Sequence, residues 1–78
     1  MEILARIHLA MIVTSHAVTV RVGDRIGLYT VADISHSQES ARIYFHVFYQ
    51  RTKRSNTIHR VDSYYPMDMV TYQRTGTL

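Results

Sequence analysis

The chain has 78 residues, of which 46% are hydrophobic and 19% are charged, and nine basic residues against six acids give a net charge of +3. A domain of this size buries only about 60% of its unfolded surface, which leaves room for one core and argues against a deep substrate cleft. The composition excludes a disordered chain. Without cysteine there is neither a disulfide framework nor a thiolate zinc site, which indicates a reducing, cytoplasmic location or stabilisation by oligomerisation.

The N-terminal stretch MEILARIHLAMIVTSH is apolar but is interrupted by Arg6 and His8 and begins with an acid. It is shorter than the roughly 18 apolar residues of a membrane span and lacks the basic start of a signal peptide. We therefore expect it to belong to the fold. Residues 3–14 fit either a helix or an alternating strand, and we favour the strand.

Two further strands are predicted before residue 35. AVTVRV, residues 17–22, alternates between valines and polar residues, and Gly23-Asp24 follows as a turn. Residues 26–34, IGLYTVADI, form the next strand, with Gly27 at a bend or bulge. The side chains that we expect to point inward on this strand are Ile26, Leu28, Ala32 and Ile34.

The second half of the chain carries the strongest strand pattern. ARIYFHVFYQRT, from residue 41, is dense in aromatic and β-branched residues. TIHRVDS (57–63) is the partner strand, YYPMD (64–68) is a single turn, and a short strand covers 69–73. Five or six closely spaced strands predict a single all-β domain over residues 1–78, either a small antiparallel barrel or a strongly bent sheet.

The order of VRVGDRI, TVADI, a long aromatic strand and VDSYYPMD resembles the SH3-like small barrels of the KOW and Tudor type, over roughly residues 18–73. Members of these branches show a similar Gly-Asp turn, a similar Val/Ile strand and often a one-turn helix before the closing strand. The resemblance therefore implies a short one-turn helix near residue 66, at Tyr65-Pro66-Met67. The resemblance implies a domain that binds nucleic acid, peptides or proteins and does no chemistry. Small basic β proteins are also frequent among phage gene products, which is an analogy only.

Alternation within residues 41–51 separates two faces. The odd-numbered residues, such as Phe45 and Val47, are core-like. If Val61 shares their face, the hairpin loop must hold an odd number of residues, most simply 53–55. A slip of one residue would place Arg60 and Asp62 in the core, at a cost of several kcal/mol for unpaired buried charge.

In that register Arg60 lies opposite Phe48, so the even-numbered side chains of residues 41–51 and Arg60 form one patch. The basic loop lies at one end of this patch. This patch is a stacking platform for unpaired bases or an apolar surface for a protein. Alternatively, Tyr44 and Phe48 pack under the N-terminal segment or against a second subunit. The candidate partner-binding residues are Arg42, Tyr44, His46, Phe48, Arg51, Lys53, Arg54 and Arg60.

The basic loop, residues 51–54, has two interpretations of its own. As a phosphate-binding loop it would supply several charge contacts, and its affinity for nucleic acid would depend measurably on salt. As a plain hairpin tip, its charges keep the loop solvated and protect an exposed edge from aggregation.

Enzymatic residues are not recognisable. The five histidines show no metal-ligand spacing, no glycine-rich phosphate loop is present, and no serine sits in a nucleophile elbow. His46 and Asp62 are the one acid–histidine pair that the predicted register brings together, and such a pair on neighbouring strands is usually structural. We expect no enzyme, no catalytic residue, no cofactor and no metal.

Two binding functions remain. The first is a protein-interaction module or small inhibitor, possibly phage-encoded. The second is a nucleic-acid-binding protein that uses the same face and the basic loop. We favour the first because +3 is a modest charge for a nucleic-acid specialist. No membrane partner is expected, and a homodimer is possible through the aromatic face or an outer strand.

Overall fold

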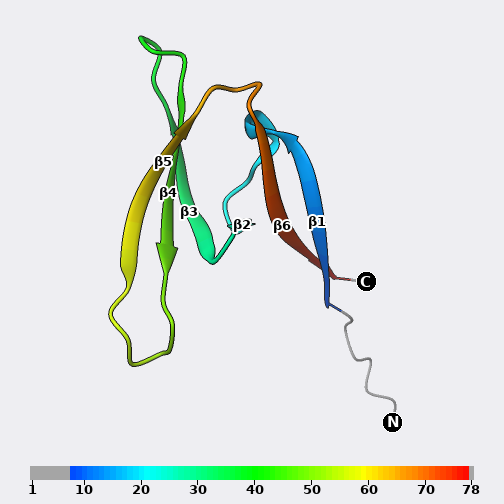
Figure 1. Ribbon diagram of the computed structural model, residues 1–78, viewed down its shortest axis with the longest axis vertical. Helices are drawn as coiled ribbons and strands as arrows, with labels where there is room; N and C mark the ends of the chain where they lie inside the picture. The colour runs from blue at the N-terminus through cyan, green and yellow to red at the C-terminus, as the bar shows by residue number, and fades with distance from the viewer. Residues whose placement is uncertain (1–7, 78) are drawn as a thin grey trace.

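The computed structural model describes residues 8–77. Six strands form one antiparallel sheet in the order β1-β6-β2-β3-β4-β5 (Figure 1). The sheet is not closed, since β1 and β5 remain at its edges, and this confirms the all-β prediction in the form of a bent open sheet. The elements in chain order are β1 (His8–His16), the 3-10 turn η1 (Ala17–Thr19), β2 (Arg25–Ile26), β3 (Tyr29–His36), β4 (Ile43–Tyr49), β5 (Ile58–Tyr64) and β6 (Met69–Thr77).

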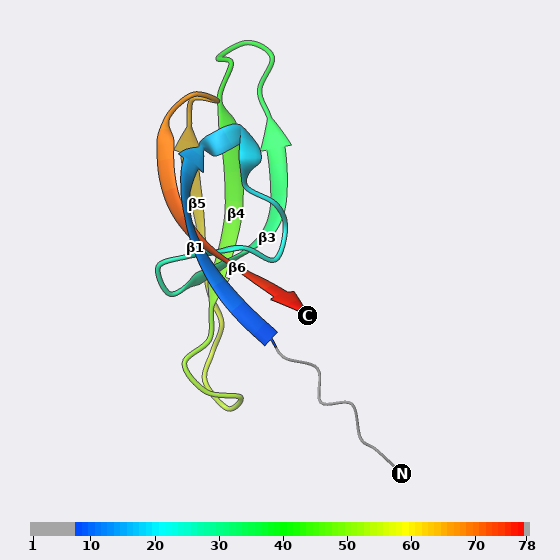
Figure 2. The same cartoon turned by 90° about the vertical axis from the view of Figure 1, so that its right-hand side faces the viewer.

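The bend divides the sheet into two arms, with β3, β4 and β5 in one and β1 and β6 in the other (Figures 1 and 2). The short β2 connects them, because Arg25 pairs with Thr30 of β3 and with Gln73 of β6. At one end, η1 meets the β5–β6 turn, and the backbone N–H of Ala17 donates to the carbonyl of Asp68 at 2.8 Å. This hydrogen bond extends the β1–β6 pairing into the turn that leads back to β5.

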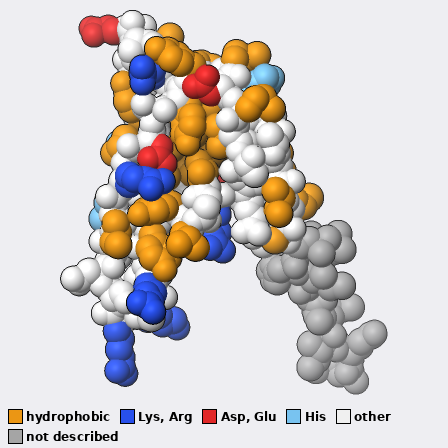
Figure 3. Space-filling view, viewed as in Figure 1, with side chains coloured by type: hydrophobic (Ala, Val, Ile, Leu, Met, Phe, Trp, Pro, Cys, Tyr) orange, Lys and Arg blue, Asp and Glu red, His pale blue; other side chains and the backbone are white. Residues whose placement is uncertain are grey.

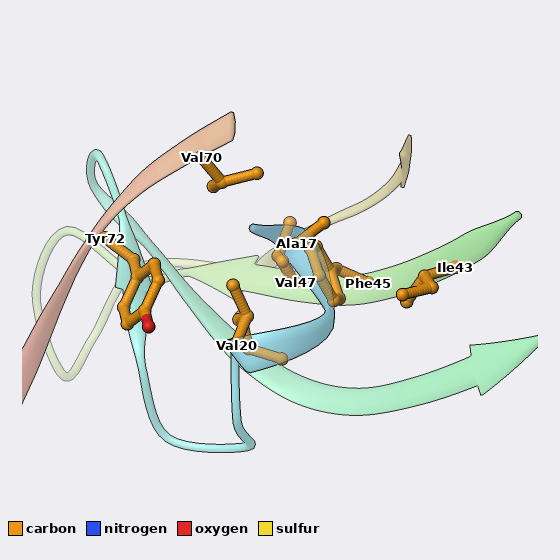
Figure 4. Packing of buried hydrophobic residues seen from close by; sticks show 8 residues of the cluster. Ala17, Val20, Ile43, Phe45, Val47, Val70 and Tyr72 are labelled. Carbon is orange, nitrogen blue, oxygen red and sulfur yellow. The ribbon is translucent and has the colours of Figure 1, made fainter. Parts of the chain in front are cut away.

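The core fills the space between the arms (Figure 4). Phe45 is its largest fully buried side chain, at 0% exposure. Ile43, Phe45 and Val47 of β4 contribute, as their alternation predicts. Tyr49, on the same face, is only partly buried, and Ala41, which the alternation also assigns to this face, is exposed. The buried hydrophobic residues are Ala17, Val20, Val31, Ile43, Phe45, Val47, Val70 and Tyr72.

The N-terminal strand is confirmed from His8 onward, where β1 pairs with β6 along its whole length. Residues 3–7 of the predicted strand lie outside the described residues. No helix in the described part of the chain has the length and apolar character needed to cross a membrane.

The predicted strand over residues 17–22 is wrong. This segment begins with η1, and Val20 is buried while Val18 and Val22 are exposed. The hydroxyl of Thr19 donates to the carbonyl of His16 at 2.8 Å, a local side-chain bond that competes with strand pairing. The following turn is confirmed, and Gly23 supplies its positive φ of 96°.

The predicted single strand over residues 26–34 is wrong, because a turn at Gly27 and Leu28 divides it into β2 and β3. Its inward residues also differ from the prediction. Ile26 and Ile34 pack against the core, as expected, but Leu28 and Ala32 are exposed and Val31 is buried instead. The pairing with β4 shifts between Val31 and Asp33, which indicates a β-bulge. The extra residue resets the alternation, so inward residues on the two sides of the bulge do not share one parity.

The predicted one-turn helix near residue 66 is replaced by a tight turn. The backbone N–H of Asp68 donates to the carbonyl of Tyr65 at 3.0 Å, and the Asp68 carboxylate accepts from the N–H of Tyr65 at 2.8 Å. The Asp68 side chain thus hydrogen-bonds to the backbone of the turn, as aspartate commonly does in turns, and the segment does not form a helix. The last strand, β6, is longer than predicted and reaches Thr77.

The predicted register of the β4–β5 hairpin is wrong by one residue. Val47 pairs with Arg60, and His46 pairs with Val61. Val61 is therefore not on the core face and is 55% exposed. The loop spans residues 50–57, an even number. The penalty that was expected for this register does not arise, because β5 is an edge strand and the Arg60 side chain remains 46% exposed while pairing with Asp62.

A buried ion pair ties the turn after η1 to β6. The Asp24 carboxylate is 4% exposed and accepts from the Arg74 guanidinium at 2.8 and 2.9 Å and from the backbone N–H of Arg21 at 2.8 Å. Burial alone would raise the pKa of Asp24, but the hydrogen bonds from Arg74 and Arg21 outweigh it and lower that pKa. Asp24 is therefore a structural anion.

Candidate functional site: the outer face of β3, β4 and β5

The side of the three-stranded arm that points away from the core forms a continuous surface. Directly opposite residues on neighbouring strands point to the same side of a sheet. The pairings therefore define this outer face as Thr30, Asp33 and Ser35 of β3, Tyr44, His46 and Phe48 of β4, and His59, Val61 and Ser63 of β5.

Apolar and aromatic side chains run along the middle of the outer face. Tyr44 and Phe48 are half-buried, and His46 between them is exposed. Val61 lies opposite His46 and is 55% exposed. The face is therefore amphipathic in the structure, as its alternation along β4 predicts.

Arg42 lies directly before the first residue of β4 and is held in place by two residues, one from β5 and one from the following turn. Its guanidinium donates to Ser63 Oγ at 3.0 Å and to the Tyr65 hydroxyl at 3.2 Å, and it lies 4.7 Å from the centre of the Tyr65 ring. No carboxylate within residues 8–77 forms a salt bridge with it. The guanidinium is thus pre-oriented and retains its charge for a partner.

His46 does not contact Asp62. Its Nε2 lies 3.1 Å from Ser35 Oγ, and Asp62 is on the opposite side of the sheet because it pairs with Phe45. The expected acid–histidine pair is therefore wrong, and the register is the cause.

Arg60 is likewise absent from the outer face. It lies on the core side of β5, where its guanidinium is 4.0 Å from the centre of the Tyr29 ring and its Nε is 2.7 Å from Asp62 Oδ1. The hydrogen bond with Asp62 raises the pKa of Arg60. The predicted pairing of Arg60 with Phe48 is therefore wrong, because His59 is the residue that pairs with Phe48.

The basic loop is ordered by its own polar side chains. The Gln50 amide donates to the carbonyls of Lys53 and Ser55 at 3.4 and 2.9 Å, and the Thr52 and Ser55 hydroxyls lie 2.8 Å apart. The cationic side chains project from this frame at the free end of the hairpin (Figure 3). The exposed cations are Arg51, Lys53 and Arg54.

A depression of about 340 Å³ borders the outer face at Phe48 and runs toward the loop, with Arg25 and Leu28 on its far side. It is large enough to receive a side chain, and its volume lies at the lower end of the range of small-molecule pockets. Within residues 8–77, no three His, Asp or Glu side chains gather as metal ligands would. The outer face and this depression together form a surface that is suited to binding another molecule.

Comparison with known proteins adds no relative. The chain matches no known family, no curated protein and no solved structure.

The structure brings together half of the residues that the sequence predicts for the site. Arg42, Tyr44, His46 and Phe48 share one face, whereas Arg60 faces the core side and the loop cations lie beyond the strand ends. Sequence reasoning missed the outer-face residues Asp33, His59, Val61 and Ser63 and the neighbouring Tyr65. Only the correct register would have identified those on β5.

Proposed function

We propose that this protein is a non-enzymatic binding module that recognises another protein through the outer face. The observation that carries the proposal is Arg42, which is stacked on Tyr65, bonded to Ser63 and free of a carboxylate partner within the described residues. Tyr and Arg dominate the energetic centres of protein interfaces. A pre-oriented arginine loses little side-chain entropy when a partner carboxylate binds it.

The distribution of charge favours a protein over a nucleic acid. The outer face has only Arg42 as a fixed cation at its end and carries the acid Asp33. Arg60, which would have strengthened a phosphate-binding patch, is paired with Asp62 instead. The open, bent all-β sheet is compatible with the small barrels whose members bind proteins or peptides, and an inhibitor that blocks a partner's surface is one form of the same function.

The experiment is photo-crosslinking from the outer face. A photoreactive phenylalanine analogue at Tyr44 should capture a specific protein from the native host, whereas the same analogue at the exposed Ile12 of β1 should not. Titration of the purified captured protein should then show weaker binding to Arg42→Ala and Tyr44→Ala, with Ile12→Ala unchanged. Equal binding by all variants would contradict the proposal.

A second candidate, nucleic-acid binding, is supported by the ordered basic loop. Arg51, Lys53 and Arg54 are all exposed, and no acid occurs between Glu39 and Asp62. Titration with a fluorescent oligo(dT) at two salt concentrations separates the candidates. Tight binding that weakens steeply with salt, and that is lost in Lys53→Ser/Arg54→Ser, would favour nucleic acid over protein.

A further inference from the structure

The strand β5 is an open edge of the sheet. It pairs with β4 over seven consecutive residues without a bulge, and no strand within residues 8–77 pairs with its other side (Figure 1). It contains neither proline nor lysine. Its two charges on the core side, Arg60 and Asp62, form an ion pair with each other, so they do not act as the unpaired inward charges that protect other edges from pairing. Its outward backbone groups are available to another strand.

A second copy of the chain fits this edge through two-fold symmetry. A two-fold axis normal to the sheet pairs antiparallel strands whose residue numbers sum to an even number, because the core faces must stay on the same side. The midpoint of β5 is Val61. Pairing centred there uses the whole strand and sets Arg60 opposite Asp62 of the second copy, and Asp62 opposite its Arg60.

Only this register matches the charges. An axis at Arg60 would place two arginines opposite each other, and an axis at Asp62 would do the same with two carboxylates, which is destabilising. The axis at Val61 also pairs apolar residues, since Ile58 meets Tyr64 of the second copy and Val61 meets its counterpart. Ile58 and Val61 are 52% and 55% exposed in the monomer, so the pairing covers apolar surface.

The two charges are already arranged for this role. Arg60 and Asp62 lie two residues apart on the same side of β5, with Nε and Oδ1 2.7 Å apart. Two-fold pairing would place each charge beside two opposite charges, one from its own strand and one from the other copy. Alternating charges of this kind stabilise a specific register.

We propose that two copies of this protein associate through β5, antiparallel about Val61, to form one continuous twelve-stranded sheet in which Arg60 and Asp62 of each copy pair across the interface. The outer faces of the two copies then lie side by side. This proposal is independent of the proposed function, because it concerns the edge of the sheet and not the partner of its outer face.

Sedimentation analysis of charge-reversed variants tests the proposal. The wild-type chain should dimerise as its concentration rises. Arg60→Asp and Asp62→Arg should remain monomeric where the wild type is dimeric, and the double reversal should dimerise again, with folding followed by circular dichroism. Arg51→Asp, which changes the charge in the loop, should dimerise like the wild type. A monomeric wild type, or single reversals that still dimerise, would overturn the proposal.

A single cysteine provides a test that leaves both charges in place. The natural chain has no cysteine, so Val61→Cys should form an intermolecular disulfide with its symmetry mate under mild oxidation, because directly opposite residues have suitable separations. Ser63→Cys is the matched control, since its counterpart lies several residues away across the axis. Equal crosslinking by both variants, or none by Val61→Cys, would contradict the register.

Discussion

Arg60 lies directly across the β4–β5 ladder from Val47, which is 1% exposed, yet the Arg60 side chain remains 46% exposed. Two residues that face the same side of the sheet thus have opposite environments, because β4 is internal and β5 is an edge. The edge strand β5 can therefore carry a charged residue on its core side, whereas a charge at the position of Val47 on the internal strand β4 would be buried.

The register of this hairpin can be measured directly. Cross-strand nuclear Overhauser effects between backbone protons should connect Val47 with Arg60 and His46 with Val61. Directly opposite residues bring either their amide or their α protons close together. Contacts from Val47 to Val61 and from His46 to Asp62 would instead support the register that the sequence predicts, in which Val61 shares the core face.

Truncation of the central core residue should be costly. Phe45→Ala should lower the free energy of unfolding by about 3–5 kcal/mol, because the ring is fully buried and leaves a cavity. Phe48→Ala, on the half-buried outer face, should cost clearly less. Urea denaturation of both variants provides the comparison, and equal losses would show that Phe48 belongs to the core.

Acid should weaken the tie between the turn after η1 and β6. The pKa of Asp24 is lowered in the folded protein, so its stabilising contribution is complete above the ordinary aspartate pKa and is lost as pH falls through the lowered folded value. At neutral pH, Asp24→Asn should cost about 3 kcal/mol, because Arg74 loses its buried partner. Denaturant titrations at neutral and acid pH should show this difference shrinking, while Asp33→Asn, at an exposed site, should have little effect at either pH.

The turn before β2 should depend on glycine for conformational reasons alone. Gly23 has a φ of 96°, and a Cβ there would meet nothing within 4 Å, so Gly23→Ala should cost about 1–2 kcal/mol from the backbone conformation. Gly76→Ala is the control, because its Cβ would make only an ordinary contact at 3.9 Å with Met11. Thermal melts of the two variants should separate accordingly, and equal melting temperatures would argue against the positive φ.

The basic loop should contribute little to stability. Lys53→Ser/Arg54→Ser should change the free energy of unfolding by less than about 1 kcal/mol, because exposed charges at a hairpin tip contribute little. Gln50→Ala should be the more disruptive change, since the Gln50 amide bonds two loop carbonyls. Chemical denaturation of both variants distinguishes the cations from the residue that orders them.

Local patterns in the sequence predict much of the fold. The alternation in β4 correctly identifies Ile43, Phe45 and Val47 as core residues, since both neighbours of β4 enforce its faces. The same logic failed for β5, where the edge position relaxes the penalty on Arg60. It also failed for β3, where a bulge that no residue type announces resets the alternation. The stacking of Arg42 on Tyr65 depends on the register and was not predictable without it.

The pairing of β1 with β6 has a consequence for the order of folding. His8 pairs with Thr77, so the first described strand must wait until the last has been synthesised, and closing so long a loop is entropically costly. The β3–β4–β5 arm needs only local contacts and can form earlier. We therefore expect the arm to appear first and the core to close late, as β6 brings Val70 and Tyr72 against it.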